Sequence, residues 1–141
     1  MNSKEDATKR LRVAERHLRE AEEASKRDDY PEVVGHSQLS VENSAKTVIA
    51  CFRIPSWTHD PSGELVTVLS EMKIEKSLAD GLQSLGEYAH KLAPEHATAD
   101  YGTVSKLPEE IYGEDDARDA LQMAREGVEI AGQFLQYYFG T

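Results

Sequence analysis

The sequence DYPEVVGHSQLSVENSAKTVIACFRIPSWTHD, residues 29–60, contains one long amphipathic helix, a break and the start of another helix. Asp29-Tyr30-Pro31 is typical of a helix start, since Asp is a favoured cap and Pro fits the first turn. Pro55 disfavours helical geometry at the residue before it, so the helix should end by Arg53. Asp60-Pro61 then predicts a new helix. The apolar seam of the long helix consists of Val34, Val41, Ala45, Val48 and Phe52.

A polar face runs beside this apolar seam. Gln38, Glu42 and Lys46 are spaced four residues apart and therefore share one side of the helix. One interpretation is a helix-surface ion pair between Glu42 and Lys46. The other is a polar cluster that faces the loop carrying Trp57 and His59. We expect Trp57 itself to plug the end of the bundle rather than to stack on a nucleic-acid base.

Apolar residues recur at spacings of three and four along most of the remaining chain. They predict long helices over residues 3–27, 78–92 and 114–138, and a short helix after Pro61 that stops or bends near residues 73–77. Residues 94–113 hold two prolines and two glycines without sustained periodicity, which predicts a long loop. We therefore expect an all-α fold, an antiparallel four-helix up-and-down bundle with one additional short helix, forming a single domain over residues 1–141.

The charge is distributed unevenly along the chain. The net charge of −10 lies in residues 54–141, which hold 16 acidic and 6 basic residues. Because phosphate affinity depends mainly on Lys and Arg, this balance argues against sequence-specific DNA binding, and any RNA contact needs a local basic patch. No apolar run approaches the length of about 20 residues that a membrane span needs, and the charged first thirty residues do not resemble a signal peptide. The single cysteine forms no internal disulfide, so we expect a cytoplasmic protein without membrane contact.

Few other residues point to a particular chemistry. Cys51 lies beside Phe52 at the end of a helix and is expected to be a small buried residue rather than a nucleophile. The five histidines show no metal-ligand spacing with cysteine or paired carboxylates. A glycine-rich phosphate loop is also missing from the sequence. We therefore expect neither a metal nor a cofactor.

Several motifs follow one another in a characteristic order. Asp29-Tyr30 opens a helix, a QxxxExxxK pattern follows at Gln38, Glu42 and Lys46, and Thr58-His59-Asp60 precedes the next helix. Later in the chain come Pro108, Tyr112, Asp116-Ala117, Leu121 and Ala124. This order resembles the HEPN domain of archaea and bacteria over about residues 10–135. The resemblance marks a candidate ligand-binding or polar cluster of Gln38, Glu42, Lys46 and Asp60.

The resemblance implies two functions. The first is a binding or adaptor module whose expected partners are a second copy of the chain, a small nucleotidyltransferase and a nucleotide or RNA, in a toxin–antitoxin-like context. The second is a metal-independent ribonuclease. HEPN ribonucleases use an arginine followed four to six residues later by a histidine, usually late in the bundle, and Arg53 and His59 are the candidate pair with that spacing. His59 would act as base or acid, and Arg53 would hold the phosphate.

Overall fold

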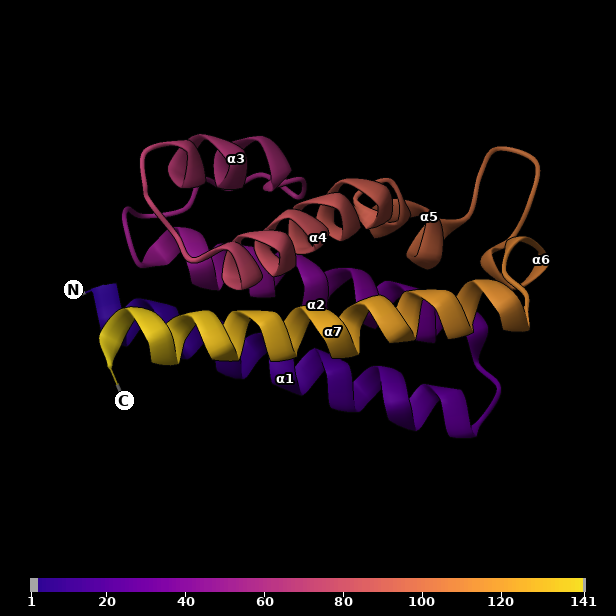
Figure 1. The fold of residues 1–141 in the computed structure, drawn as a ribbon. Coiled ribbons are helices and arrows are strands. Elements are labelled where there is room, and N and C mark those ends of the chain that lie inside the picture. Colours follow the sequence, from indigo (N-terminus) through magenta and orange to yellow (C-terminus); the bar gives the residue numbers. More distant parts are fainter. Residues whose placement is uncertain (1–2, 141) are drawn as a thin grey trace.

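The structure is a computed structural model that describes residues 3–140. The described residues form seven helices and no strand: α1 (Ser3–Lys26), α2 (Tyr30–Ala50), α3 (Ser62–Ser70), α4 (Lys76–Leu92), α5 (Glu95–Tyr101), α6 (Pro108–Ile111) and α7 (Glu114–Phe139). The prediction of an all-α fold is confirmed. The four long helices run alternately up and down, so that the start of α1 and the end of α7 lie at the same end of the bundle (Figure 1). Between residues 3 and 140, none of these helices combines the length and the apolar character of a membrane span.

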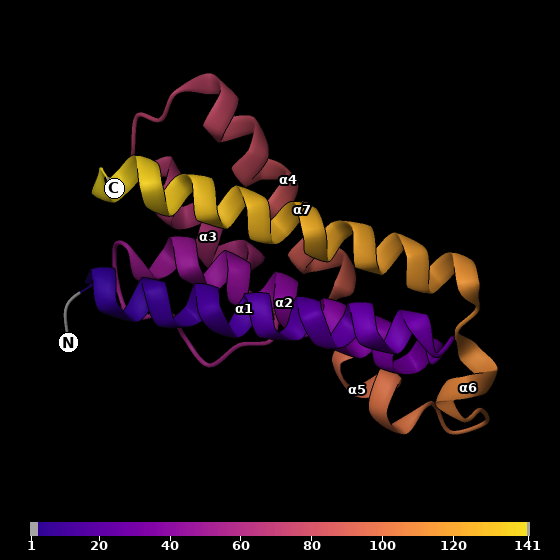
Figure 2. The same ribbon diagram turned by 90° about the horizontal axis from the view of Figure 1, so that it is seen from below.

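Helix α2 is the central element and packs against each of the other six helices. Figure 2 shows α1 lying directly along it, with α7 on the neighbouring side. Because neighbours surround α2, 14 of its 21 residues are buried, whereas α1 buries only four alanines. The side chains of Ala14 and Ala21 are small enough to let α1 approach closely. Ser40 of α2 uses this proximity to donate a hydrogen bond of 2.8 Å to the carbonyl of Ala14.

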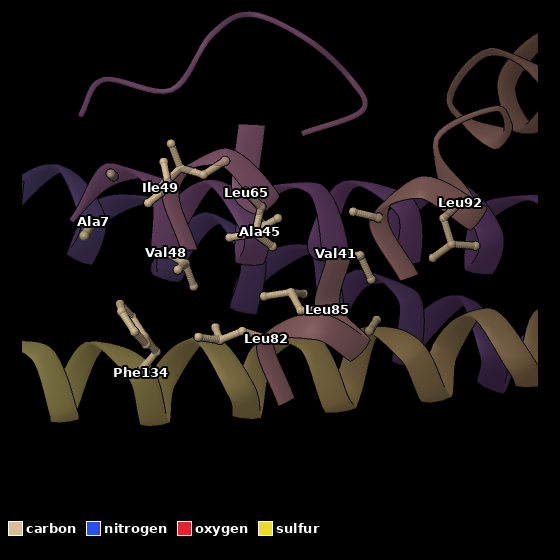
Figure 3. Close-up of a cluster of buried hydrophobic side chains, with 14 of the residues drawn as sticks. Ala7, Val41, Ala45, Val48, Ile49, Leu65, Leu82, Leu85, Leu92 and Phe134 are labelled. Carbon is tan, nitrogen blue, oxygen red and sulfur yellow. The ribbon is translucent and has the colours of Figure 1, made fainter. Parts of the chain in front are cut away.

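The apolar core lies between α2, α4 and α7 and is closed by α1 and α3. Figure 3 shows side chains from these five helices directed toward one another. Phe134 of α7 is the largest fully buried side chain and packs beside Val48 and Leu82. Truncating such a buried phenylalanine to alanine typically costs about 3–5 kcal/mol. The core therefore fixes α2 relative to the helices that surround it.

The predicted loop over residues 94–113 is wrong in part, because it contains α5 and α6. These helices span seven and four residues, too few turns to produce a visible periodicity. Tyr112 fixes the segment by donating a hydrogen bond of 2.9 Å to Glu95. Gly102 ends α5 at a φ of 74°, where a Cβ would collide with the carbonyl of Lys106. The bundle thus has three short helices rather than one.

The loop between α2 and α3 has the predicted boundaries, but the position of Trp57 differs from the prediction. Helix α2 ends at Ala50, three residues before Arg53, and α3 begins at Ser62. Trp57 is 99% exposed, so the expectation that it plugs the bundle is wrong. The two prolines on either side of it, Pro55 and Pro61, are buried, as is Cys51 at the start of this loop. The chain breaks between α3 and α4 at residues 71–75, in agreement with the predicted boundary.

Candidate functional site

The polar face of α2 is buried. Gln38, Glu42 and Lys46 are 2%, 6% and 7% exposed, so the interpretation of a helix-surface ion pair is wrong. The three side chains lie beneath the loop that carries His59 and beneath α5. A buried carboxylate is costly unless its charge is paired and its oxygens are hydrogen-bonded. The neighbours of Glu42 meet both conditions.

Three donors converge on the carboxylate of Glu42. Its Oε1 accepts hydrogen bonds from Gln38 Nε2 at 2.9 Å and from His59 Nδ1 at 3.0 Å. Its Oε2 accepts from the ammonium of Lys46 at 3.2 Å. The carboxylate is therefore paired with the ammonium of Lys46 and oriented by two further donors, Gln38 and His59. This arrangement places His59 above a fixed negative group.

His96 of α5 completes the arrangement and was not anticipated from the sequence. Its Nδ1 lies 3.1 Å from Gln38 Oε1, and its ring stacks on that of His59 with 3.6 Å between centroids and 19° between planes. The carboxylate and the amide oxygen can only accept, so both rings carry their proton on Nδ1 when they are neutral. We call Gln38, Glu42, Lys46, His59 and His96 the Glu42 cluster.

Arg53 does not join the Glu42 cluster. Its guanidinium forms an ion pair of 3.3 Å with Glu64 of α3. Glu64 also accepts hydrogen bonds from the backbone nitrogen and the hydroxyl of Ser56. Within residues 3–140, no hydrogen bond or ion pair links Arg53 to His59. The catalytic role of these two residues stays a prediction.

Asp60 lies at the start of α3, apart from Glu42. Its Oδ1 accepts from the backbone nitrogen and the hydroxyl of Ser62, at 3.1 and 2.6 Å, and its Oδ2 lies 2.9 Å from His90 Nδ1. Partial burial acts to raise the pKa of Asp60, but the hydrogen bonds from Ser62 and His90 outweigh it and lower the pKa below the usual range. Asp60 is thus held as a carboxylate that stabilises the helix start. The structure does not bring it together with Gln38, Glu42 and Lys46.

Two further features carry less chemistry. Cys51 is buried, and burial raises the pKa of its thiol to about 12, so the expectation of a packing residue rather than a nucleophile is confirmed. A hollow of about 730 Å³ lies between α3 and α4, lined mainly by apolar side chains such as Leu65, Val66, Leu69 and Leu82. The Glu42 cluster is therefore the stronger candidate, since it combines a fixed carboxylate with two imidazoles, of which His59 has a half-exposed side chain.

One of the two sequence interpretations placed the polar face opposite the loop of His59, in agreement with the contact between His59 and Glu42, whereas nothing in the sequence linked His96 to this face. His59 is 17 residues from Glu42, and His96 is 58 residues from Gln38. The absence of metal-ligand spacing led to the expectation that the chain has no metal site. The fold nevertheless assembles Glu42, His59 and His96 into a group whose ligand atoms lie within 4.8 Å of one another. Such a group is chemically able to hold a metal ion.

Comparison with known proteins places this chain in a family. The model of the HEPN domain matches residues 7–134. The chain is 32% identical over 137 residues to a protein of Methanocaldococcus jannaschii named "Putative toxin MJ1304", a match that covers 92% of this chain and 88% of that protein. The crystal structure of TT1696 from Thermus thermophilus has the same fold, with a TM-score of 0.67 and 19% identity over 94% of this chain and 98% of the other. The chain belongs to the HEPN domain family.

Proposed function

We propose that this HEPN domain is the toxin-like member of a two-protein toxin–antitoxin pair. In this role it acts as a protein-interaction and nucleotide-associated module, and its partner is a small nucleotidyltransferase. The observation that carries the proposal is the match over 92% of the chain to the Methanocaldococcus relative, whose name describes a toxin. The family resemblance supplies the expected class of partner.

The geometry of the site favours a binding role. The charge of Glu42 is balanced by Lys46, and the guanidinium of Arg53 is paired with Glu64 rather than with the two imidazoles. A ribonuclease needs a cation beside its base to stabilise the charge that develops on the phosphate. The one cation of the Glu42 cluster, Lys46, is already paired with Glu42, so the cluster is better suited to hold a partner or a nucleotide. We also propose a homodimer of single-domain chains in the cytoplasm, for which light scattering should give twice the chain mass of 15.7 kDa.

The experiment is inducible expression of the chain alone and together with a small nucleotidyltransferase, the proposed class of partner. We expect the chain alone to slow growth and co-expression to restore it. The two purified proteins should also form a complex of fixed stoichiometry in size-exclusion chromatography. Normal growth with the chain alone, together with separate elution of the two proteins, would contradict the proposal.

One observation favours a second candidate, the metal-independent ribonuclease. The carboxylate of Glu42 holds His59 through Nδ1 at 3.0 Å, as a carboxylate orients an imidazole that acts as a general base. Arg53 would contribute phosphate contact after leaving Glu64. The test is cleavage of RNA by the purified chain in the presence of a chelator. If the chain is a ribonuclease, His59→Ala and Arg53→Ala should both abolish cleavage, whereas the exposed His90→Ala should not. Absence of cleavage by the unmodified chain would exclude the ribonuclease function.

A further inference from the structure

We propose that Glu42, His59 and His96 form a binding site for a divalent transition-metal ion of the zinc type. Their ligand atoms lie within 4.8 Å of one another. Imidazole nitrogen and carboxylate oxygen bind zinc at about 2.0–2.2 Å, so ligand atoms around a tetrahedral ion are about 3.3 Å apart. His59 Nδ1 and Glu42 Oε1 are already 3.0 Å apart. A shift of at most about 1.5 Å by the third ligand completes a three-ligand site.

The three ligands differ in how firmly they are held. Glu42 is buried on α2, where Gln38 and Lys46 hold its two oxygens. His59 lies in the loop before α3 and His96 on the seven-residue helix α5, and both are more exposed than Glu42. The two rings can therefore adjust around an ion while the carboxylate stays in place. A fixed ligand supported by hydrogen bonds to its other oxygen is the usual arrangement around protein-bound metals.

Binding moves the proton of His59 to its other ring nitrogen. The Nδ1 proton that His59 shares with Glu42 leaves, Nε2 takes a proton from solvent so that the ring stays neutral, and the ion takes the position between Nδ1 and the oxygen. The ammonium of Lys46 remains 3.2 Å from the second oxygen of Glu42 and opposes the charge of the ion. This repulsion limits the affinity, so the site depends on both imidazoles. We expect loss of either imidazole to lower the affinity at least tenfold.

Three protein ligands leave one position of a tetrahedral ion for water or for an oxygen of a bound molecule. The half-exposed His59 lies on the solvent side of the cluster, where such a molecule can enter. This inference does not rest on the proposed function. Metal binding is measured without a partner protein or RNA, so either proposal can fail while the other stands.

The experiment is calorimetric titration of the tag-free, chelator-treated chain with Zn²⁺, with Co²⁺ absorption as a second probe of coordination. We expect one ion per chain and the visible spectrum of four-coordinate Co²⁺. His59→Gln and His96→Gln should each lower the affinity at least tenfold. Zn²⁺ should raise the thermal midpoint of the unmodified chain and should not raise that of His96→Gln. Circular dichroism of the metal-free variants establishes that they are folded.

The matched control is His36→Gln. His36 also lies on α2, is partly buried and stacks on another imidazole, that of His17. This variant should bind Zn²⁺ within twofold of the unmodified chain. The inference is overturned if the chain binds no stoichiometric ion, if folded His59→Gln and His96→Gln keep the original affinity, or if His36→Gln loses as much affinity as they do.

Discussion

The Glu42 cluster and the pair formed by His17 and His36 both join α2 to a neighbouring helix through two imidazoles. In the pair, the Nδ1 atoms of His17 and His36 are 3.0 Å apart and the rings are 5.3 Å apart between centroids. His36 Nε2 lies 3.3 Å from Glu32. The cluster likewise places an imidazole 3.0 Å from a glutamate of α2, and its two rings stack more closely, at 3.6 Å. The two sites therefore have similar residues in similar contacts.

The two sites differ in the burial of their carboxylates, Glu32 and Glu42. The side chain of Glu32 is 49% exposed, in the first turn of α2, whereas that of Glu42 is 8% exposed in the middle of the helix. Water can solvate Glu32 if its histidine leaves, but it cannot reach Glu42 to the same degree. The buried carboxylate therefore needs Lys46, and its neighbours are held in one arrangement. Position along α2, rather than residue type, decides which histidine pair can become a functional site.

The largest effect should follow from removing the buried carboxylate. Glu42→Ala leaves the ammonium of Lys46 buried without its counter-charge, and we expect the free energy of unfolding to fall by about 3–5 kcal/mol. The matched change Glu32→Ala removes an exposed partner and should cost about 0.5 kcal/mol or less. Urea unfolding of the three proteins measures both values.

A second substitution tests the cause of that loss. Adding Lys46→Met to Glu42→Ala removes the unpaired ammonium and should recover part of the lost stability. Equal costs for Glu42→Ala and Glu32→Ala would contradict the distinction between the two carboxylates. A double variant that is less stable than Glu42→Ala alone would contradict the unpaired ammonium of Lys46 as the cause of the loss.

Much of the fold could be predicted because its long helices carry repeated patterns. Helices α1, α2, α4 and α7 span 17 to 26 residues, which is enough for apolar positions to recur over several turns. The seven residues of α5 provide two turns, and their helical state depends on packing against α2. The exposure of Trp57 likewise depends on the surrounding fold and could not be predicted from its residue type. Its apolar ring favours burial, but the flanking chain leaves it 99% exposed.

Some residues of the candidate site could be predicted from local sequence spacing, and others could not. Gln38, Glu42 and Lys46 could be placed on one face because their spacing is local and helical geometry fixes it. Their burial could not be predicted, because it depends on how α5 and the loop before α3 cover that face. His96 has no local signal at all, since it meets Gln38 across 58 residues of sequence. The residues missed from sequence are thus those brought in by a helix too short to recognise.

A smaller effect should follow from removing one imidazole at each site. His96→Ala leaves the amide oxygen of Gln38 without its donor, and Gln38 is almost fully buried, so we expect a loss of about 1–3 kcal/mol. His36→Ala separates His17 from Glu32, and both of these partners retain contact with water. Its cost should be about 1 kcal/mol or less. Urea unfolding distinguishes the two variants, and a larger loss for His36→Ala would reverse the comparison.

The last prediction concerns the pKa of His17 and the pH dependence of stability. Burial lowers the pKa of His17 below 6.5, and His36 adds to the shift. Among the nearby charged groups, Arg16 lowers this pKa further, whereas Glu20 and Glu42 raise it. Below a pH of about 6.5, the unfolded chain therefore binds a proton at His17 that the folded chain does not accept. The contribution of His17 to stability is present above that pH and declines as the pH falls toward the folded-state pKa.

His17→Gln removes this titration, so the free energy of unfolding of the variant should fall less steeply between pH 7 and pH 5 than that of the unmodified chain. Urea unfolding at several pH values measures both slopes. Between pH 7.5 and 8.5 His17 is neutral in both states, and the two slopes should coincide there. Identical slopes below pH 6.5 would mean that His17 exchanges protons as freely in the folded bundle as in the unfolded chain. The contact between His17 and His36 would then be as open to water as an exposed contact, and α1 would lie less close to α2 than the buried side chains of Ala14 and Ala21 imply.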